Sequence, residues 1–179
     1  MRNSTITLGN LKRTPQTPRI RSGIPRPLEA TLAFLGLILT APLLALSALA
    51  IILTSRGPAI FCQERVGRNG RTFFLYKLRT MRVTNEGPQV TAGNDSRITK
   101  VGKFLRQTKL DEFPELWNIL KGDMSLSGPR PEVPRYVDLK DPAWRLVLEA
   151  RPGITDPVTL RLRNEEALLA SVVGDRENF

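Results

Sequence analysis

Apolar residues are concentrated in one long stretch near the start of the chain, residues 28–54, in which Glu29 is the only charged residue. A run this long and this apolar predicts a membrane helix. A signal peptide is a weaker alternative, because its apolar core is only about 7–15 residues long. Pro42 lies near the middle and predicts a kink. Each half is then about 20 Å long at ~1.5 Å per residue, too short to cross an apolar core of ~30 Å alone.

Basic residues flank this stretch on both sides. Residues 1–27 contain no acidic residue and several prolines, so we expect a disordered, basic cytoplasmic tail. The residues that follow the stretch include Arg56, Arg65, Arg68 and Arg71. Because basic flanks tend to stay in the cytoplasm, we favour a re-entrant helix that enters the membrane and returns to the same side. A kinked spanning helix is the alternative, since many spanning helices tolerate a proline.

The next pattern is that of a β-hairpin over residues 59–81. Two runs typical of strands lie on either side of Asn69-Gly70, which is a strong signal for a type I′ turn. The alternation of side chains along the second strand places Lys77 and Arg79 on the same face. Two cations therefore lie together near the end of the hairpin.

Short helices follow a loop over residues 82–95. Apolar residues recur at helical spacing in two segments, first Ile98, Val101, Phe104 and Leu105, then Phe113, Leu116, Trp117 and Leu120. Gly122 predicts the end of the second helix. A loop rich in Pro and Gly, residues 125–134, precedes a last helix over residues 144–150. The expected fold is α+β: a re-entrant membrane helix kinked at Pro42, then a small cytoplasmic domain with a β-hairpin and several short helices.

Composition narrows the possible chemistry. The chain has 179 residues, a net charge of +10, no histidine and a single cysteine, Cys62. These absences exclude a histidine base, an internal disulfide and a cysteine-rich zinc site. Neither of the common glycine-rich nucleotide-binding loops occurs in the sequence. Catalysis must therefore use carboxylates, Lys, Arg, hydroxyls, Cys62 or a metal bound by oxygen ligands.

The adjacent carboxylates Asp111 and Glu112 are the strongest candidates for chemistry. We expect Asp111 to cap the helix that follows, with Pro114 in its first turn, so that both carboxylates face a cavity at the positive end of that helix. The plain alternative is a helix cap with an additional charge in the first turn. The cations nearby in sequence or in the expected fold favour phosphoryl chemistry; they are Lys77, Arg79, Arg106 and Arg130.

Three segments resemble a known family. The runs LYKLRTM, FLRQTKLDEFPELWNILKGDMSLSGPRP and RPGIT are similar to those of the bacterial sugar transferases, the monotopic phosphoglycosyl transferases. The resemblance covers roughly residues 24–156. It implies an enzyme of the bacterial inner membrane, with residues 28–54 as a re-entrant anchor in the lipid and residues 55–179 as a catalytic domain facing the cytoplasm.

The resemblance also implies a reaction and a role for each site residue. Asp111 would attack the β-phosphate of a UDP-sugar, release UMP and form a covalent phosphosugar intermediate. Polyprenyl (undecaprenyl) phosphate would then accept the sugar phosphate, which would initiate synthesis of a capsule, lipopolysaccharide, exopolysaccharide or other glycoconjugate. Glu112 would hold Mg²⁺. Lys77, Arg106 and Arg130 match the family's cationic positions near the phosphates.

Some features depart from the family pattern and leave alternatives open. Ala41-Pro42 stands where relatives often have Ser-Pro, and Asp156-Pro157 stands where many have Gly-Trp. Members usually continue beyond the position of Phe179, so we expect an incomplete C-terminus. An inactive, truncated membrane scaffold of the same fold is therefore one alternative. A membrane-tethered basic module that binds nucleic acid is a weaker one, and we expect no nucleic-acid partner. The sugar and the oligomeric state, with a homodimer as one option, stay open.

Overall fold

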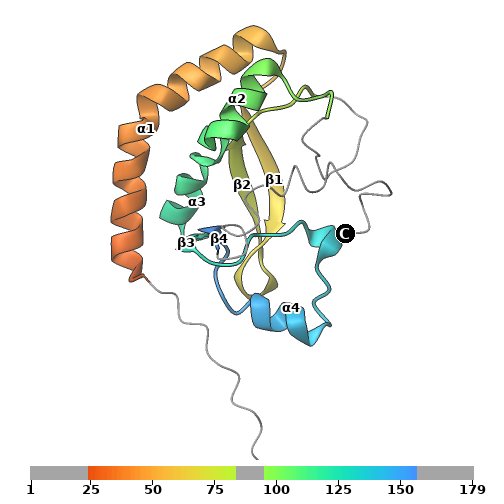
Figure 1. Ribbon diagram of the computed structural model, residues 1–179. Helices are drawn as coiled ribbons and strands as arrows, with labels where there is room; N and C mark the ends of the chain where they lie inside the picture. Colours follow the sequence, from red (N-terminus) through yellow and green to blue (C-terminus); the bar gives the residue numbers. More distant parts are fainter. Residues whose placement is uncertain (1–23, 84–94, 157–179) are drawn as a thin grey trace, which may run out of the picture.

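The computed structural model describes residues 24–83 and 95–156. The expectations for most of the basic tail, for most of the loop over residues 82–95 and for the chain beyond Asp156 lie outside the described residues. The elements, shown in Figure 1, are α1 (Arg26–Thr54), β1 (Ile60–Val66), η1 (Arg68–Gly70), β2 (Thr72–Leu78), α2 (Lys100–Thr108), η2 (Leu110–Glu112), α3 (Glu115–Lys121), β3 (Ser125–Ser127), η3 (Pro134–Tyr136), α4 (Pro142–Val147) and β4 (Gly153–Thr155). The predicted α+β fold, an apolar N-terminal helix followed by a small domain with a β-hairpin, is confirmed.

The apolar stretch forms a single helix, α1, which continues through Pro42. One proline in the helix interior removes one backbone hydrogen bond but need not end the helix. The ribbon of α1 curves along one side of the domain (Figure 1). By length and composition α1 could cross a membrane. Many of its large apolar side chains are exposed, among them Phe34, Leu35, Ile38, Leu39, Leu46 and Leu53.

The hairpin agrees with its prediction. Strands β1 and β2 pair antiparallel from Ile60 opposite Leu78 to Val66 opposite Thr72. Asn69 and Gly70 both have positive φ, 59° and 76°, as a type I′ turn requires. The backbone N–H of Arg71 donates to the carbonyl of Arg68 at 3.3 Å, which closes the turn.

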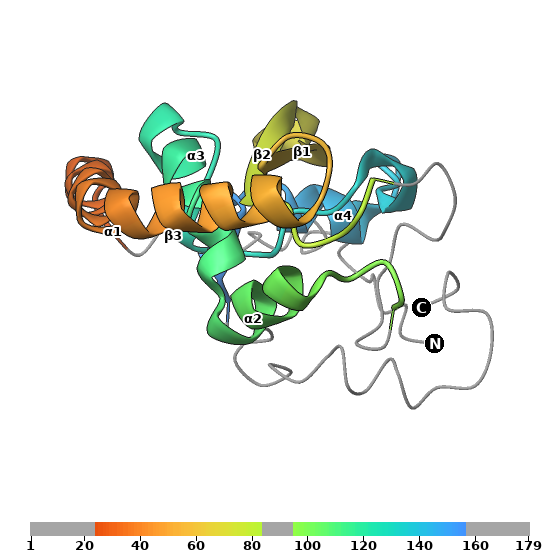
Figure 2. The same ribbon diagram turned by 90° about the horizontal axis from the view of Figure 1, so that it is seen from above.

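Two small hydrophobic clusters form the core, and α1 contributes to both. The first contains Ala33, Phe73, Leu75, Ile119 and Met124. The second contains Ile51, Leu78 and Leu105. In Figure 2, α1 runs along the domain past α3, α2 and the hairpin. The apolar helix is therefore packed into the domain at both of its ends.

The ends of the short helices were only partly predictable. Helix α2 begins after Thr99, whose hydroxyl accepts the N–H of Gly102 at 2.9 Å. Helix α3 ends at Gly122, where φ is 91°, as predicted. The last helix was placed too late in the sequence. It runs from Pro142 to Val147 because Asp141 caps its start by accepting the N–H of Ala143.

A short parallel pair, β3 and β4, was missed in the sequence. It lies in the predicted loop and in the segment after the last helix, with Ser125 opposite Gly153 and Ser127 opposite Thr155. Glycines allow the two backbones to approach closely. A Cβ atom at Gly153 would lie 2.1 Å from the backbone nitrogen of Gly128, and one at Gly128 would lie 2.2 Å from the carbonyl oxygen of Arg151.

Candidate active site

The dyad Asp111-Glu112 lies in the 3₁₀ turn η2, between α2 and α3. The expectation that Asp111 caps the following helix is wrong. Helix α3 begins at Glu115, its N-cap is Pro114, and no side chain among the described residues caps it. The physical reason is local: Lys109 adopts a left-handed conformation, φ 58°, which ends α2, and the chain then makes one tight turn before α3. That turn carries both acidic residues.

Asp111 is buried, with 8% of its surface exposed. Its Oδ1 atom has no hydrogen-bond partner within the described part of the chain. Burial, and then the charge of Glu112, raise the pKa of Asp111, while Lys77, Arg106 and Lys109 act in the opposite direction. A buried carboxylate oxygen that is not satisfied by the protein is a candidate for contact with a substrate.

Glu112 has the opposite environment. Its Oε1 lies 3.1 Å from the Nζ of Lys77 and 3.5 Å from the NH2 of Arg130. Burial alone would raise the pKa of Glu112, but the charges of Lys77 and Arg130 together hold it below its ordinary value. The two adjacent carboxylates therefore differ in pKa, and such a difference is typical of pairs with separate chemical roles.

Glu115 is a third carboxylate at the site, and it was not singled out in the sequence. It is almost fully buried, and its Oε1 lies 3.1 Å from Lys77 Nζ. Burial raises the pKa of Glu115, with Lys77 opposing the shift and Glu112 adding to it. Its spacing of three residues from Glu112, near the start of a helix, was the available signal. Lys77 thus lies between two carboxylates.

The predicted cations Lys77 and Arg130 lie at the dyad, as the distances to Glu112 show. Arg106 lies near enough for its charge to lower the pKa of Asp111, and its Nε donates to the hydroxyl of Thr80 at 2.9 Å. These three cations come from β2, α2 and the loop after β3. The tertiary structure therefore brings Lys77, Arg106 and Arg130 together around one pair of carboxylates.

Arg79 contacts backbone carbonyls that follow α1. Its guanidinium donates to the carbonyls of Ser55, Arg56 and Gly57, with an NH2–O distance of 2.9 Å to Ser55. These carbonyls directly follow the end of α1. The contacts are those of a cap for a helix end, and they give no support to the expected binding of substrate phosphate.

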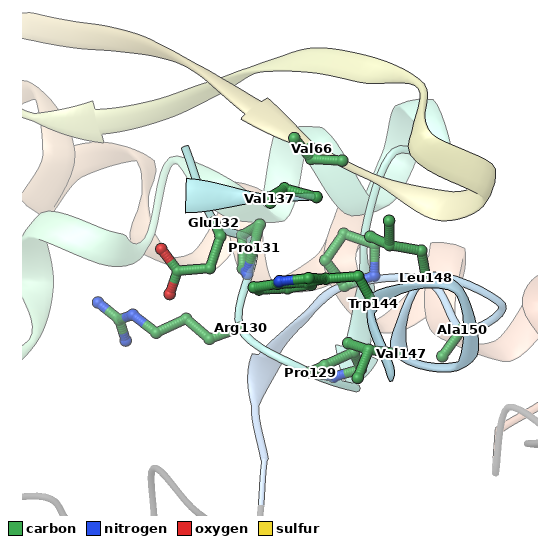
Figure 3. Close-up of a pocket in the computed structure, with 11 residues that line it drawn as sticks. Val66, Pro129, Arg130, Pro131, Glu132, Val137, Trp144, Val147, Leu148 and Ala150 are labelled. Carbon is green, nitrogen blue, oxygen red and sulfur yellow. The ribbon is translucent and has the colours of Figure 1, made fainter. Parts of the chain in front are cut away.

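Apolar side chains around Trp144 line a cavity and support the loop that carries Arg130. Figure 3 shows the indole packed among prolines and valines, with the side chains of Arg130 and Glu132 extending to one side. The cavity lining includes Val66, Pro129, Pro131, Val137 and Val147. Trp144 therefore helps to fix the loop from which Arg130 reaches Glu112.

The dyad fits a magnesium ion that takes most of its ligands from elsewhere. The described residues contain no group of three or more His, Cys, Asp or Glu side chains that could hold a metal. Mg²⁺ usually needs only one or two carboxylates, together with waters and substrate phosphates. The adjacent carboxylates Asp111 and Glu112 match that number, and Oδ1 of Asp111 has no hydrogen-bond partner within the described residues.

Comparison with known proteins finds one family and several similar proteins. The family model described as bacterial sugar transferase matches residues 20–176. The chain is 45% identical over 141 residues to UDP-glucose:undecaprenyl-phosphate glucose-1-phosphate transferase of Caulobacter vibrioides, covering 76% of this chain and 53% of that protein. It is 42% identical over 144 residues to the protein of the same name in Escherichia coli, covering 75% of this chain and 31% of that protein.

A third relative carries a different sugar in its name. The chain is 40% identical over 153 residues to UDP-N-acetylgalactosamine-undecaprenyl-phosphate N-acetylgalactosaminephosphotransferase of Aeromonas hydrophila, covering 83% of this chain and 35% of that protein. The chain spans about half or less of the length of these three relatives.

Proposed function

Because the chain belongs to the bacterial sugar transferase family, we propose that it transfers a sugar 1-phosphate from a UDP-sugar to undecaprenyl phosphate. The products are UMP and a polyprenyl-diphosphate sugar, with which synthesis of a polysaccharide or glycoconjugate begins. The observation that carries the proposal is the buried Asp111, whose Oδ1 has no partner within the described residues, next to a cation-paired Glu112.

The transfer takes two displacements, with Asp111 as the nucleophile in the first and as the leaving group in the second. In the first, a carboxylate oxygen bonds to the β-phosphorus, and the bond from that phosphorus to the bridging oxygen breaks, with its electron pair leaving on UMP. In the second, a phosphate oxygen of the polyprenyl phosphate bonds to the same phosphorus and the aspartyl oxygen leaves. Burial raises the pKa of Asp111, and a more basic carboxylate is a better nucleophile once it is ionised.

The neighbouring groups bind and orient the diphosphate. Lys77, Arg106 and Arg130 supply positive charge where negative charge accumulates on the phosphate oxygens. Glu112 stays ionised because its pKa is lowered, so it suits the role of holding Mg²⁺. When bound, Mg²⁺ would neutralise charge on the diphosphate.

Helix α1 acts as a re-entrant, monotopic anchor in the inner membrane, kinked at Pro42, with the catalytic domain in the cytoplasm. Contacts at both ends of α1 support this proposal. At its start, Arg26 donates to the carbonyl of Leu120 at 2.9 Å, and after its end the carbonyl of Ser55 accepts from Arg79. One small domain contacts both ends, whereas the ends of a spanning helix lie on opposite sides of a bilayer of about 30 Å or more.

The test is release of UMP. Detergent-solubilised protein is mixed with Mg²⁺, polyprenyl phosphate and a panel of UDP-sugars, beside the Asp111→Asn variant. We expect release with one or a few sugars, turnover only when the lipid is present, and none in the variant. Equal release by Asp111→Asn would eliminate the proposed nucleophile. Folded protein that releases no UMP from any UDP-sugar would instead favour an inactive scaffold.

A further inference from the structure

A second, polar hollow adjoins the dyad. It is open to solvent and is lined by Arg65, Leu75, Lys77, Glu115, Arg130, Pro131, Gly153 and Ile154. Three of these residues are cations and only one is an acid. Lys77 and Arg130 also contact Glu112, so the hollow and the dyad share one wall.

Arg65 is the cation of this hollow that has no role so far. It lies on β1, one strand away from Lys77, and its side chain is held in place from two sides. Its NH1 donates to the carbonyl of Pro131 at 2.8 Å, and its Nε and NH2 donate to the side-chain oxygen of Gln63 at 3.1 and 2.6 Å. These bonds use three of the five guanidinium N–H groups. Glu132 lies only at 4.0 Å, a loose ion pair that an anion can replace.

The surroundings of Arg65 favour a negative ligand. Burial, and the nearby charge of Arg130, lower the pKa of Arg65, with Glu132 and Glu115 opposing. Two guanidinium groups and an ammonium group line one space, in which Glu115 is the acidic lining residue. A fixed guanidinium suits phosphate in particular, since its planar N–H groups match the spacing of phosphate oxygens.

The position of the hollow indicates which phosphate enters it. Asp111 does not line the hollow, although Lys77 and Arg130 connect the two places. A phosphate in the hollow is therefore not the one that Asp111 attacks but a neighbour of it. In the donor, that neighbour is the phosphate that leaves with UMP. In the second displacement, the neighbour is the phosphate of the polyprenyl acceptor.

We propose that the hollow formed by Arg65, Lys77, Glu115 and Arg130 is a subsite for a phosphate monoester, with Arg65 as a direct ligand of its oxygens. The inference rests on the proposed function for the identity of its two occupants, the phosphate of UMP and the phosphate of the lipid acceptor. The floor of the hollow is closely packed, because a side chain at Gly153 would collide with the backbone of Gly128.

The test measures equilibrium binding in the absence of turnover. Binding is monitored by ligand-observed NMR on detergent-solubilised protein. The ligands are UMP, uridine and a short-chain polyprenyl phosphate. Arg65→Gln is compared with Arg68→Gln, which removes the same charge from the same hairpin. Arg68 lies outside the hollow, and its Nε donates to the carbonyl of Glu149 at 2.9 Å. We expect Arg65→Gln to weaken UMP about tenfold, as the loss of one charge-assisted hydrogen bond implies, and to leave uridine unchanged.

The outcomes separate the sources of the phosphate. Weaker binding of both UMP and the lipid supports one subsite that serves both, and weaker binding of only one supports the subsite for that substrate alone. Equal affinities in the two variants for every phosphate ligand would overturn the proposal. So would an equal loss for UMP and uridine, because Arg65 would then act only by supporting the loop at Pro131.

Two further measurements keep the inference independent of folding and of the proposed reaction. If Arg65→Gln does not fold, Arg65→Lys retains the charge without the planar fork, and we expect a loss of UMP affinity of about threefold. The proposed function fails if UMP is never released, whereas the subsite fails only if phosphate binding is indifferent to Arg65. A protein without transferase activity can therefore still confirm the subsite.

Discussion

Charged groups are buried in two regions of this protein, and the two regions differ in how fully these groups are hydrogen-bonded or paired. At the start of α1, Glu29 is almost fully buried, accepts from the hydroxyl of Ser125 and accepts the N–H of Leu126 at 3.2 Å. Arg26 and Arg79 hold backbone carbonyls near the ends of α3 and α1, although each has one nitrogen without a hydrogen bond to the described residues. These charged residues have fixed local partners, and they attach α1 to the domain.

At the dyad, by contrast, the charges are only partly compensated. Lys77 is shared by Glu112 and Glu115 at equal distances of 3.1 Å, and Asp111 Oδ1 has no partner within the described residues. The pKa values of Asp111 and Glu115 are raised while that of Glu112 is lowered. Buried charge that is satisfied locally stabilises a fold, whereas buried charge that is left unsatisfied is typical of a place where a ligand completes the site.

The largest expected effect is a loss of activity without a loss of stability, on substitution of Asp111 in the dyad. Asp111→Asn should lower UMP turnover by about 10³-fold or more, since the covalent step loses its nucleophile. The same change should not lower the melting temperature, because it removes a buried charge whose Oδ1 has no hydrogen-bond partner within the described residues. Asp138→Asn, at an exposed position, is the matched control and should retain turnover. A clear loss of stability in Asp111→Asn would contradict the contrast drawn between the two regions.

The next largest effect is a loss of stability when the contact that attaches the start of α1 to the domain is removed. Glu29→Ala should destabilise the protein by about 2–3 kcal/mol, because Ser125 and the N–H of Leu126 lose their partner inside the fold. Activity per folded molecule should change little. Thermal melting in detergent, with the exposed Glu64→Ala as control, measures the difference. A variant as stable as Glu64→Ala would show that this buried contact does not attach α1.

A somewhat smaller effect tests the role of Arg79. Arg79→Ala should cost about 1–3 kcal/mol of stability because the carbonyls after α1 lose their donor, and it should leave the KM for the UDP-sugar unchanged. Arg82→Ala, an exposed arginine three residues later, is the comparison and should change neither quantity. A large rise in KM without loss of stability would restore the expectation that Arg79 binds phosphate.

The smallest effect is a difference in pH dependence between Glu112 and Glu115. The pKa of Glu115 is raised in the fold, so its charged form opposes folding once the pH exceeds the ordinary carboxyl pKa. Glu115→Gln should therefore raise the melting temperature by a few degrees at pH 7, and the gain should vanish below about pH 4.

Glu112→Gln should behave in the opposite way. The pKa of Glu112 is lowered, so its charge contributes stability above the ordinary carboxyl pKa, and this contribution is lost as the pH falls through the folded value. The variant should therefore melt below the wild type at pH 7 and converge with it in acid. Melting curves across this pH range, recorded side by side, check both signs. Shifts of the same sign in the two variants would show that the carboxylates are not divided in this way.

Several features were determined by the sequence alone because their causes are local. The length and apolar composition of residues 28–54 predicted α1, and Asn69-Gly70 predicted the type I′ turn because few residues accept two successive positive φ angles. Gly122 predicted the end of α3 for the same reason. The motif around Asp111 and Glu112 indicated the family and the place of the chemistry before any contact was known.

Only the tertiary structure decided how distant parts of the chain meet. Lys77 lies near the end of β2 and Arg79 directly after that strand, yet Lys77 contacts the dyad and Arg79 contacts the end of α1. Glu115 contacts Lys77, and Arg65 contacts Pro131. Strand β3 pairs with β4, although α4 lies between them in the sequence. The reason is physical: backbone angles and side-chain periodicity act over a few residues, whereas burial and charge pairing depend on neighbours that are far apart in sequence.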